Sequence, residues 1–78
     1  MYILIEKPET LEYLSTNGRW TKDPIGGKCF PSTRMAVRAA KQEAIDRFSV
    51  VRYIPNTNQF VNLAHGRGTG APEVLAQV

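Results

Sequence analysis

Residues 30–48 read FPSTRMAVRAAKQEAIDRF, and this stretch decides the fold class. The side-chain oxygen of Ser32 or Thr33 can accept a hydrogen bond from the first free N–H groups of a helix, so a helix is predicted to begin there. At about 100° per residue, small and apolar side chains fall on one side of this helix. They are Ala36, Val37, Ala40, Ala44 and Phe48. We therefore expect the helix to run to about Asp46 or Arg47 and to lie close against a sheet.

Short runs of aromatic and β-branched residues on both sides of this helix predict strands. The runs are residues 2–5, 11–15, 19–21, 49–54 and 59–63, with a further extended piece at 28–30. Asn17-Gly18 is the strongest hairpin signal, because both residues tolerate the positive φ of a type I′ turn. The sequence predicts an α+β fold, in which a small antiparallel sheet of about four or five short strands packs against one helix in the order β-β-(β)-α-β-β.

The composition changes after Leu63. Residues 66–70 (GRGTG) have no hydrophobic periodicity, which is typical of a linker. Pro72 permits a short helical turn in the residues that follow it. We expect a single α+β domain over residues 1–64, followed by a glycine-rich linker and C-terminal tail over residues 65–78.

Length and composition exclude several classes of protein. Seventy-eight residues suffice for one domain and leave little apolar area for a deep pocket. Cys29 is the only cysteine, which rules out an intramolecular disulfide and suits a reducing compartment. The apolar run at residues 1–5 is too short for a signal peptide, and no segment approaches the roughly 20 apolar residues of a membrane helix. We therefore expect a cytoplasmic protein without a membrane partner.

Candidates for catalysis are few. Cys29 and His65 could act as a nucleophile and its base, but the pattern favours Cys29 as a small core residue and His65 as an exposed residue beside the linker. One cysteine and one histidine are too few ligands for a zinc site. The glycines of residues 66–70 lack the Gly-Lys-Ser/Thr ending of a phosphate-binding loop. The sequence predicts no enzyme activity, no metal and no cofactor.

The formal net charge of +3 indicates a basic surface, where a binding function is expected. Arg34, Arg38, Lys41 and Ile45 follow one another at steps of four, three and four residues, so they form one stripe on the predicted helix. A solvated helix face would account for the three cations. Ile45 is apolar, and an apolar side chain in a cationic stripe favours a protein interface, which Met35 would widen.

A second group of cations surrounds the single tryptophan. Arg19 and Lys22 flank Trp20, and an aromatic ring between cations can stack on a base while the cations hold phosphate. The alternative places Trp20 inside a core that is short of bulky residues. From both groups we predict partner binding by Arg34, Arg38, Lys41, Ile45, Arg19 and Lys22.

Residues 13–23 (YLSTNGRWTKD), Phe30-Pro31-Ser32 and the alanine-rich helix together resemble a recurrent class of small phage and prophage accessory proteins. The similarity covers residues 2–54, and its motifs are a turn, a cap and packing aromatics. Residues 25–27 (IGG) depart from the pattern before the phenylalanine, which leaves the local turn geometry open. The resemblance implies a host-takeover factor, such as an anti-CRISPR protein that blocks a host complex by stoichiometric binding. It carries over no binding residue.

Three hypotheses on function follow. The first is a non-enzymatic, phage-encoded inhibitor that binds a host protein or ribonucleoprotein complex in the cytoplasm of a host bacterium. The second is a small basic nucleic-acid-binding module, which would use the two groups of cations and Trp20 and would bind less tightly as salt rises. The third is a structural or accessory subunit that self-associates through an exposed strand edge.

Overall fold

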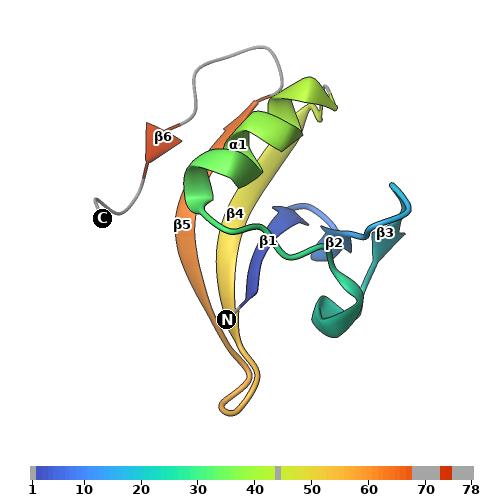
Figure 1. The fold of residues 1–78 in the computed structure, drawn as a ribbon, viewed down its shortest axis with the longest axis vertical. Coiled ribbons are helices and arrows are strands. Elements are labelled where there is room, and N and C mark those ends of the chain that lie inside the picture. The colour runs from blue at the N-terminus through green and yellow to red at the C-terminus, as the bar shows by residue number, and fades with distance from the viewer. Residues whose placement is uncertain (1, 44, 68–72, 75–78) are drawn as a thin grey trace.

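The computed structural model describes residues 2–43, 45–67 and 73–74. Its elements, in chain order, are β1 (Tyr2–Lys7), β2 (Glu12–Leu14), β3 (Trp20–Thr21), the 3₁₀ helix η1 (Pro24–Gly26), α1 (Thr33–Gln42), β4 (Arg47–Ile54), β5 (Gln59–Arg67) and β6 (Glu73–Val74). The strands form one antiparallel sheet in the order β3-β2-β1-β4-β5-β6. α1 lies across one face of this sheet and contacts β1, β4 and β5 (Figure 1). The predicted α+β class is confirmed.

β1 and β4 are the central strands. They pair from Tyr2 opposite Tyr53 to Glu6 opposite Ser49. Both faces of this pair are covered by side chains, and strands buried on both faces read as continuous apolar runs rather than alternating ones. Residues 3–5 (ILI) and 50–51 (VV) are such runs, and all of them are buried.

The larger core lies between the sheet and α1. Its buried members are Ile3, Ile5, Leu14, Phe30, Ala36, Ala40, Phe48, Val50, Leu63 and Ala64. Ala36 and Ala40 are fully buried, so the small side chains expected on the helix do let it approach the sheet closely. The N–H of Phe30 donates to the carbonyl of Ile3 (2.9 Å), which ties the segment before α1 to β1.

The start of α1 agrees with the sequence prediction and its end does not. Ser32 is the N-cap, and its Oγ accepts a hydrogen bond from the N–H of Met35 (3.2 Å). The helix ends at Gln42, before the predicted Asp46 or Arg47, and the N–H of Ile45 closes its end by donating to the carbonyl of Ala40 (3.1 Å).

Phe48, which was placed on the apolar side of the helix, belongs to β4 instead. There it pairs with Gly66, points to the same face of the sheet as Val50, and reaches the same core from the sheet. The alanine periodicity of the helix and the period-2 pattern of the strand both place Phe48 toward the core, and that coincidence explains the error. Ala44 lies outside the described residues.

The Asn17-Gly18 hairpin between β2 and β3 is present, but the predicted type I′ turn is wrong. Gly18 has a φ of 82°, whereas Asn17 is not among the described residues with positive φ. The N–H of Gly18 donates to the carbonyl of Ser15 (3.1 Å), and the N–H of Ser15 donates to the carbonyl of Arg19 (2.8 Å). This is a three-residue loop that ends in a left-handed glycine. The Oδ1 of Asn17 accepts from the N–H of Arg19 (3.0 Å), a bond that Asn17 makes without adopting positive φ.

The C-terminal part of the chain contains more strand than expected. β5 continues through residues 65–67, where the sequence predicted the start of the linker, because Gly66 and Arg67 pair with Phe48 and Arg47. Glu73 and Val74, where a helical turn was considered, form β6 and pair with His65 and Ala64. Residues 68–72 and 75–78 of the predicted linker and tail lie outside the described residues.

Replacing Phe48 with alanine should lower the free energy of unfolding by about 3–5 kcal/mol, because the ring is 1% exposed and its loss leaves a cavity under α1. Met35→Ala is the matched control: that side chain is half exposed on α1, and its loss should change stability by less than about 0.5 kcal/mol. Urea unfolding followed by circular dichroism measures both. Equal midpoints for the two variants would contradict the assignment of Phe48 to the core.

Candidate binding surface on the open face of the sheet

The face of the sheet that α1 does not cover is called the open face here. Its side chains follow from strand alternation and from the register of the pairs. They are Tyr2, Leu4 and Glu6 from β1, Tyr13 from β2, Arg47, Ser49, Val51 and Tyr53 from β4, and Phe60, Asn62 and His65 from β5. The sheet thus presents an uncovered surface of known composition.

Four aromatic rings gather on the open face. The Tyr13 and Phe60 rings are stacked, with centroids 5.7 Å apart and planes 6° apart. Tyr53 contacts Phe60 at 4.8 Å and Tyr2 at 6.0 Å. β2 and β5 are separated by the two central strands, so the Tyr13 and Phe60 rings must meet above β1 and β4. We call these four rings the aromatic cluster.

The aromatic cluster closes a second, smaller core. Beneath it Leu4 and Val51 are almost completely buried, as are Tyr13 and Tyr53 at its centre. The segment after η1 closes one side: a Cβ added at Gly27 would stand 3.2 Å from Leu4 Cδ2 and 3.3 Å from Tyr13 Cβ. A side chain at this position would force a neighbour to shift, which accounts for Gly27 among the unusual residues 25–27.

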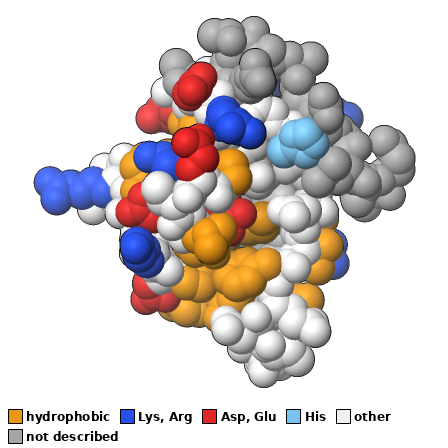
Figure 2. Space-filling view, turned by 180° about the vertical axis from the view of Figure 1, so that it is seen from behind, with side chains coloured by type: hydrophobic (Ala, Val, Ile, Leu, Met, Phe, Trp, Pro, Cys, Tyr) orange, Lys and Arg blue, Asp and Glu red, His pale blue; other side chains and the backbone are white. Residues whose placement is uncertain are grey.

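Two of the four rings of the aromatic cluster reach solvent. Phe60 is 41% exposed, although it is a large apolar residue, and Tyr2 is half-buried. Figure 2 shows the result as a hydrophobic patch over the lower half of the back of the molecule, with the histidine above it. Tyr53 is held at the centre of the cluster, because its hydroxyl donates to Oδ1 of Asn58 (3.1 Å) in the β4–β5 turn. The patch is therefore a preformed surface.

A buried acid borders the aromatic cluster. Glu6 is buried and its carboxylate accepts a hydrogen bond from the Tyr13 hydroxyl. Burial raises the pKa of Glu6 above its ordinary value, and the hydrogen bond from Tyr13 opposes this shift only in part. Burial, together with the charge of Glu6 and the same hydrogen bond, raises the pKa of Tyr13 to about 12. Tyr13 therefore stays a neutral donor at physiological pH.

The cationic stripe predicted on the helix is present in part. Arg34, Arg38 and Lys41 are exposed on α1 and, with Val37 and Gln42, line one shallow depression. Ile45 does not belong to the stripe, because α1 ends before it. Ile45 is half-buried and packs against the core beneath the helix, so the apolar residue that favoured a protein interface at this face is absent from it.

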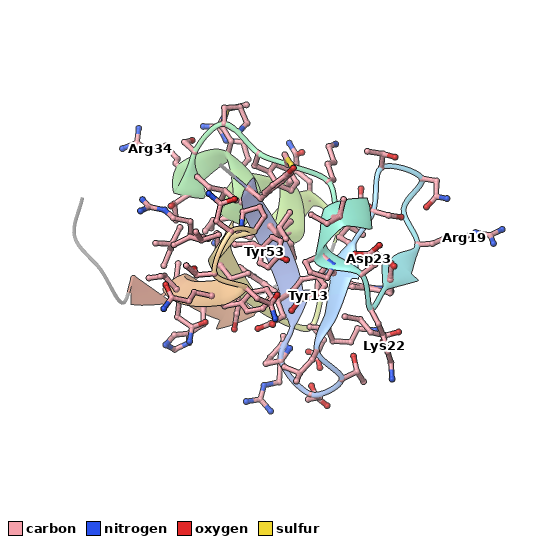
Figure 3. The ribbon with its side chains drawn as sticks, turned by 90° about the horizontal axis from the view of Figure 1, so that it is seen from below. Tyr13, Arg19, Lys22, Asp23, Arg34 and Tyr53 are labelled. Carbon is pink, nitrogen blue, oxygen red and sulfur yellow. The ribbon has the colours of Figure 1, made fainter. Side chains whose placement is uncertain are left out.

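The second group of cations lies elsewhere. Arg19 and Lys22 are exposed, but Trp20 between them is half-buried and packs against the helix-side core. A different cation, Lys7, lies over the tryptophan ring, with Nζ 4.4 Å from its centroid. In Figure 3, Arg19 and Lys22 lie on the opposite side of the molecule from Arg34. The fold does not join the two predicted groups into one site, and partner binding by either group stays a prediction.

Two further residues differ from their expected places. Cys29 is exposed near Met35 and Arg38 of α1 and is not a core residue. His65 is half-buried in β5, where it pairs with Ser49, and is not an exposed residue of a linker.

Within residues 2–43, 45–67 and 73–74, the structure contains no group of three or more His, Cys, Asp or Glu that could hold a metal ion. No helix in the described part of the chain is long and apolar enough to cross a membrane.

Sequence reasoning missed the aromatic cluster as a surface. The signal was available in the period of two that places Tyr2 with Leu4, and Val51 with Tyr53, on the same side of their strands. That pattern does not say which side the helix will cover. The exposed Phe60 could be recognised only once α1 was placed on the other face.

Glu6→Gln should raise the thermal stability of the protein at pH 7. The pKa of Glu6 is raised above its ordinary value of 4.5 in the folded protein. Ionisation of Glu6 therefore lowers the free energy of unfolding, and this loss develops as pH rises from 4.5 through the folded-state pKa. A glutamine oxygen still accepts from Tyr13 and carries no charge, so the gain should be largest at neutral pH and vanish at acid pH. Glu9→Gln, at an exposed position, is the control and should show no such pH-dependent gain. If the difference in stability between Glu6→Gln and wild type instead becomes less favourable to the variant from pH 4 to pH 7, the charge of Glu6 stabilises the fold and the prediction is contradicted.

Comparison with known proteins found no match to the chain among family models, curated proteins or solved structures.

Proposed function

We propose that this chain is a non-enzymatic binding protein that holds another protein against the aromatic cluster of its open face. The observation that carries the proposal is the half-exposed ring of Phe60, packed on Tyr13 and Tyr53 but open to solvent on its outer side. Contiguous exposed apolar surface on a small domain marks interaction sites, and aromatic residues are enriched in the buried centres of protein interfaces.

The charges around the aromatic cluster favour a protein over a nucleic acid as the partner. Around the aromatic cluster, the open-face positions from Tyr2 to Glu6, from Ser49 to Tyr53, and at Phe60 and Asn62 include no lysine or arginine, and Arg47 lies at the far end of β4. Their one ionisable carboxyl group, Glu6, is acidic. A phosphate backbone gains its affinity from cations that displace its counterions, so this face offers it little. Apolar and aromatic side chains of a protein partner suit the face better.

The resemblance to phage and prophage accessory proteins supports a finer form of the proposal. In that form the chain is a phage-encoded inhibitor, and the bound partner is a host protein or the protein part of a ribonucleoprotein complex, as in anti-CRISPR proteins. A preformed aromatic surface suits stoichiometric inhibition, because a rigid binding face loses little conformational entropy when it binds.

Binding should depend on the side of the sheet that is altered. Phe60→Asp puts a charge into the centre of the proposed interface and should abolish retention of the partner when tagged protein is incubated with extract of the bacterial host. Met35→Asp adds the same charge at a comparably exposed apolar residue on α1, and should leave retention unchanged. Circular dichroism establishes that both variants fold.

Two results would contradict this proposal. Retention that survives Phe60→Asp and is lost with Met35→Asp would move the interface to the helix. A purified partner that saturates far from one chain per binding site would remove stoichiometric inhibition, while leaving binding itself in place.

A second candidate function is favoured by Arg34, Arg38 and Lys41, which are exposed along one side of α1. Three cations in one stripe could contact three phosphates, so binding to single-stranded nucleic acid would weaken with salt with a log–log slope of about −2. Arg38→Glu should then reduce this slope by about 1. Filter binding of labelled oligonucleotides over a salt series measures the slope, and affinity that does not change with salt would exclude this function.

A further inference from the structure

Glu6 is a buried acid that no cation of the described residues compensates. Its side chain is 9% exposed and lies in the open face between Tyr13 on β2 and Ser49 on β4. Burial raises the pKa of Glu6, and the hydroxyl of Tyr13 is the one described group that lowers it. Neither Arg47 nor another described cation has this effect. A buried charge is ordinarily paired with an opposite one, so Glu6 lacks the partner that its burial calls for.

One oxygen of the Glu6 carboxylate remains accessible. A hydroxyl carries one proton, so Tyr13 engages one of the two oxygens. Among the described residues, Nε of Arg52 is the one side-chain nitrogen or oxygen that is both buried and without a hydrogen-bond partner. The second Glu6 oxygen is not in that state, and no further described group bonds to it. It therefore reaches the surface of the open face.

Tyr13 joins this carboxylate to the exposed ring of the aromatic cluster. Its ring stacks on Phe60 with centroids 5.7 Å apart, and its hydroxyl donates to Glu6. The acid and the half-exposed ring thus lie at the two ends of one side chain. A carboxylate attracts a cation by its charge, and an aromatic ring attracts one by its quadrupole. A side chain with an apolar stem and a positive end matches this pair, which describes arginine and lysine.

The net charge of the chain does not oppose a basic group at this face. Lys28, Arg34, Arg38 and Lys41 all lie within residues 24–42, which contain no acidic residue, and the rest of the chain has six basic and seven acidic residues. α1 carries three of these four cations and covers the opposite face of the sheet (Figure 1). At physiological salt, exposed charges more than about 8 Å apart are largely screened. The positive excess therefore belongs to the other side of the molecule.

We propose that the protein partner places an arginine or lysine side chain on the open face, with its apolar stem beside Phe60 and its charged end on the accessible oxygen of Glu6. The inference rests on the function proposed above, because it names the group of the partner that the open face recognises. It also gives the charge of Glu6 a purpose. A charge that destabilises the unbound chain is compensated in the complex, a common trade between stability and function.

A yeast-displayed library of random peptides provides the probe. The library is panned on the immobilised full chain, and a selected peptide is kept where Phe60→Asp abolishes its binding. Isothermal titration calorimetry then compares each kept peptide with a copy in which norleucine replaces the basic residue, because norleucine keeps an apolar stem and removes the charge. Both are titrated into wild type, Glu6→Gln and Glu9→Gln. Glu9 is exposed, so Glu9→Gln is the matched loss of one carboxylate.

The kept peptides should contain arginine or lysine beside apolar residues. Norleucine should weaken binding to wild type and to Glu9→Gln at least about tenfold, and to Glu6→Gln by less than about twofold, because glutamine has already removed the charge that the cation meets. This comparison isolates the contact between the two charges from any general effect of either replacement.

Three results would overturn the inference. Kept peptides without a basic residue, or a tenfold loss that persists in Glu6→Gln, would do so while leaving the proposed function in place, because binding would still depend on Phe60. A library that yields no Phe60-dependent peptide would count against the proposed function as well.

Discussion

Among the described residues one short α-helix covers the sheet, and it covers one face only. The rest of the structure follows from this constraint. α1 has ten residues and covers one face through Ala36, Ala40 and half-buried Val37. The β1–β4 pair at the centre of the sheet is apolar on both faces, and no second α-helix in the described part of the chain covers its other face. The aromatic cluster supplies this cover. Tyr13 and Phe60 reach in from the strands on either side of the central pair, and with Tyr2 and Tyr53 of that pair they cover Leu4 and Val51.

The two faces of the sheet differ in how they are covered. α1 covers one face, whereas a single layer of aromatic rings covers the other. The inner sides of Tyr13 and Tyr53 are buried, whereas the outer side of Phe60 stays in water. The residues that complete the fold thus also form an exposed apolar surface. Phe60 also lies in the part of β5, residues 59–62, whose outer edge pairs with no strand among the described residues, so the surface and this edge belong to one hairpin. The cluster therefore cannot be made polar without weakening the smaller core.

Sequence reasoning could predict the features that depend on neighbouring residues. The cap at Ser32, the turn at Asn17-Gly18 and the strand at residues 49–54 each rest on a local preference, and each is present. It could not predict features that depend on distant pairing. The helix stops at Gln42 because β4 must begin in time for Arg47 to pair with Arg67, twenty residues along the chain. Because the helix ends early, Ile45 does not belong to the predicted cationic stripe. The aromatic cluster was missed because no local pattern indicates which face of the sheet α1 covers.

The central claim is that a protein partner contacts the open face, and crosslinking from single positions tests it most directly. A photo-reactive p-benzoyl-phenylalanine is placed at position 60 in one chain and at position 34, on the cationic side of α1, in another. Both are irradiated in living bacterial host cells, and the adducts are separated by mass and treated with protease or nuclease. The account predicts a protease-sensitive adduct to a different protein from position 60 and none from position 34. Adducts from position 34 alone, or nuclease-sensitive adducts from either position, would contradict it.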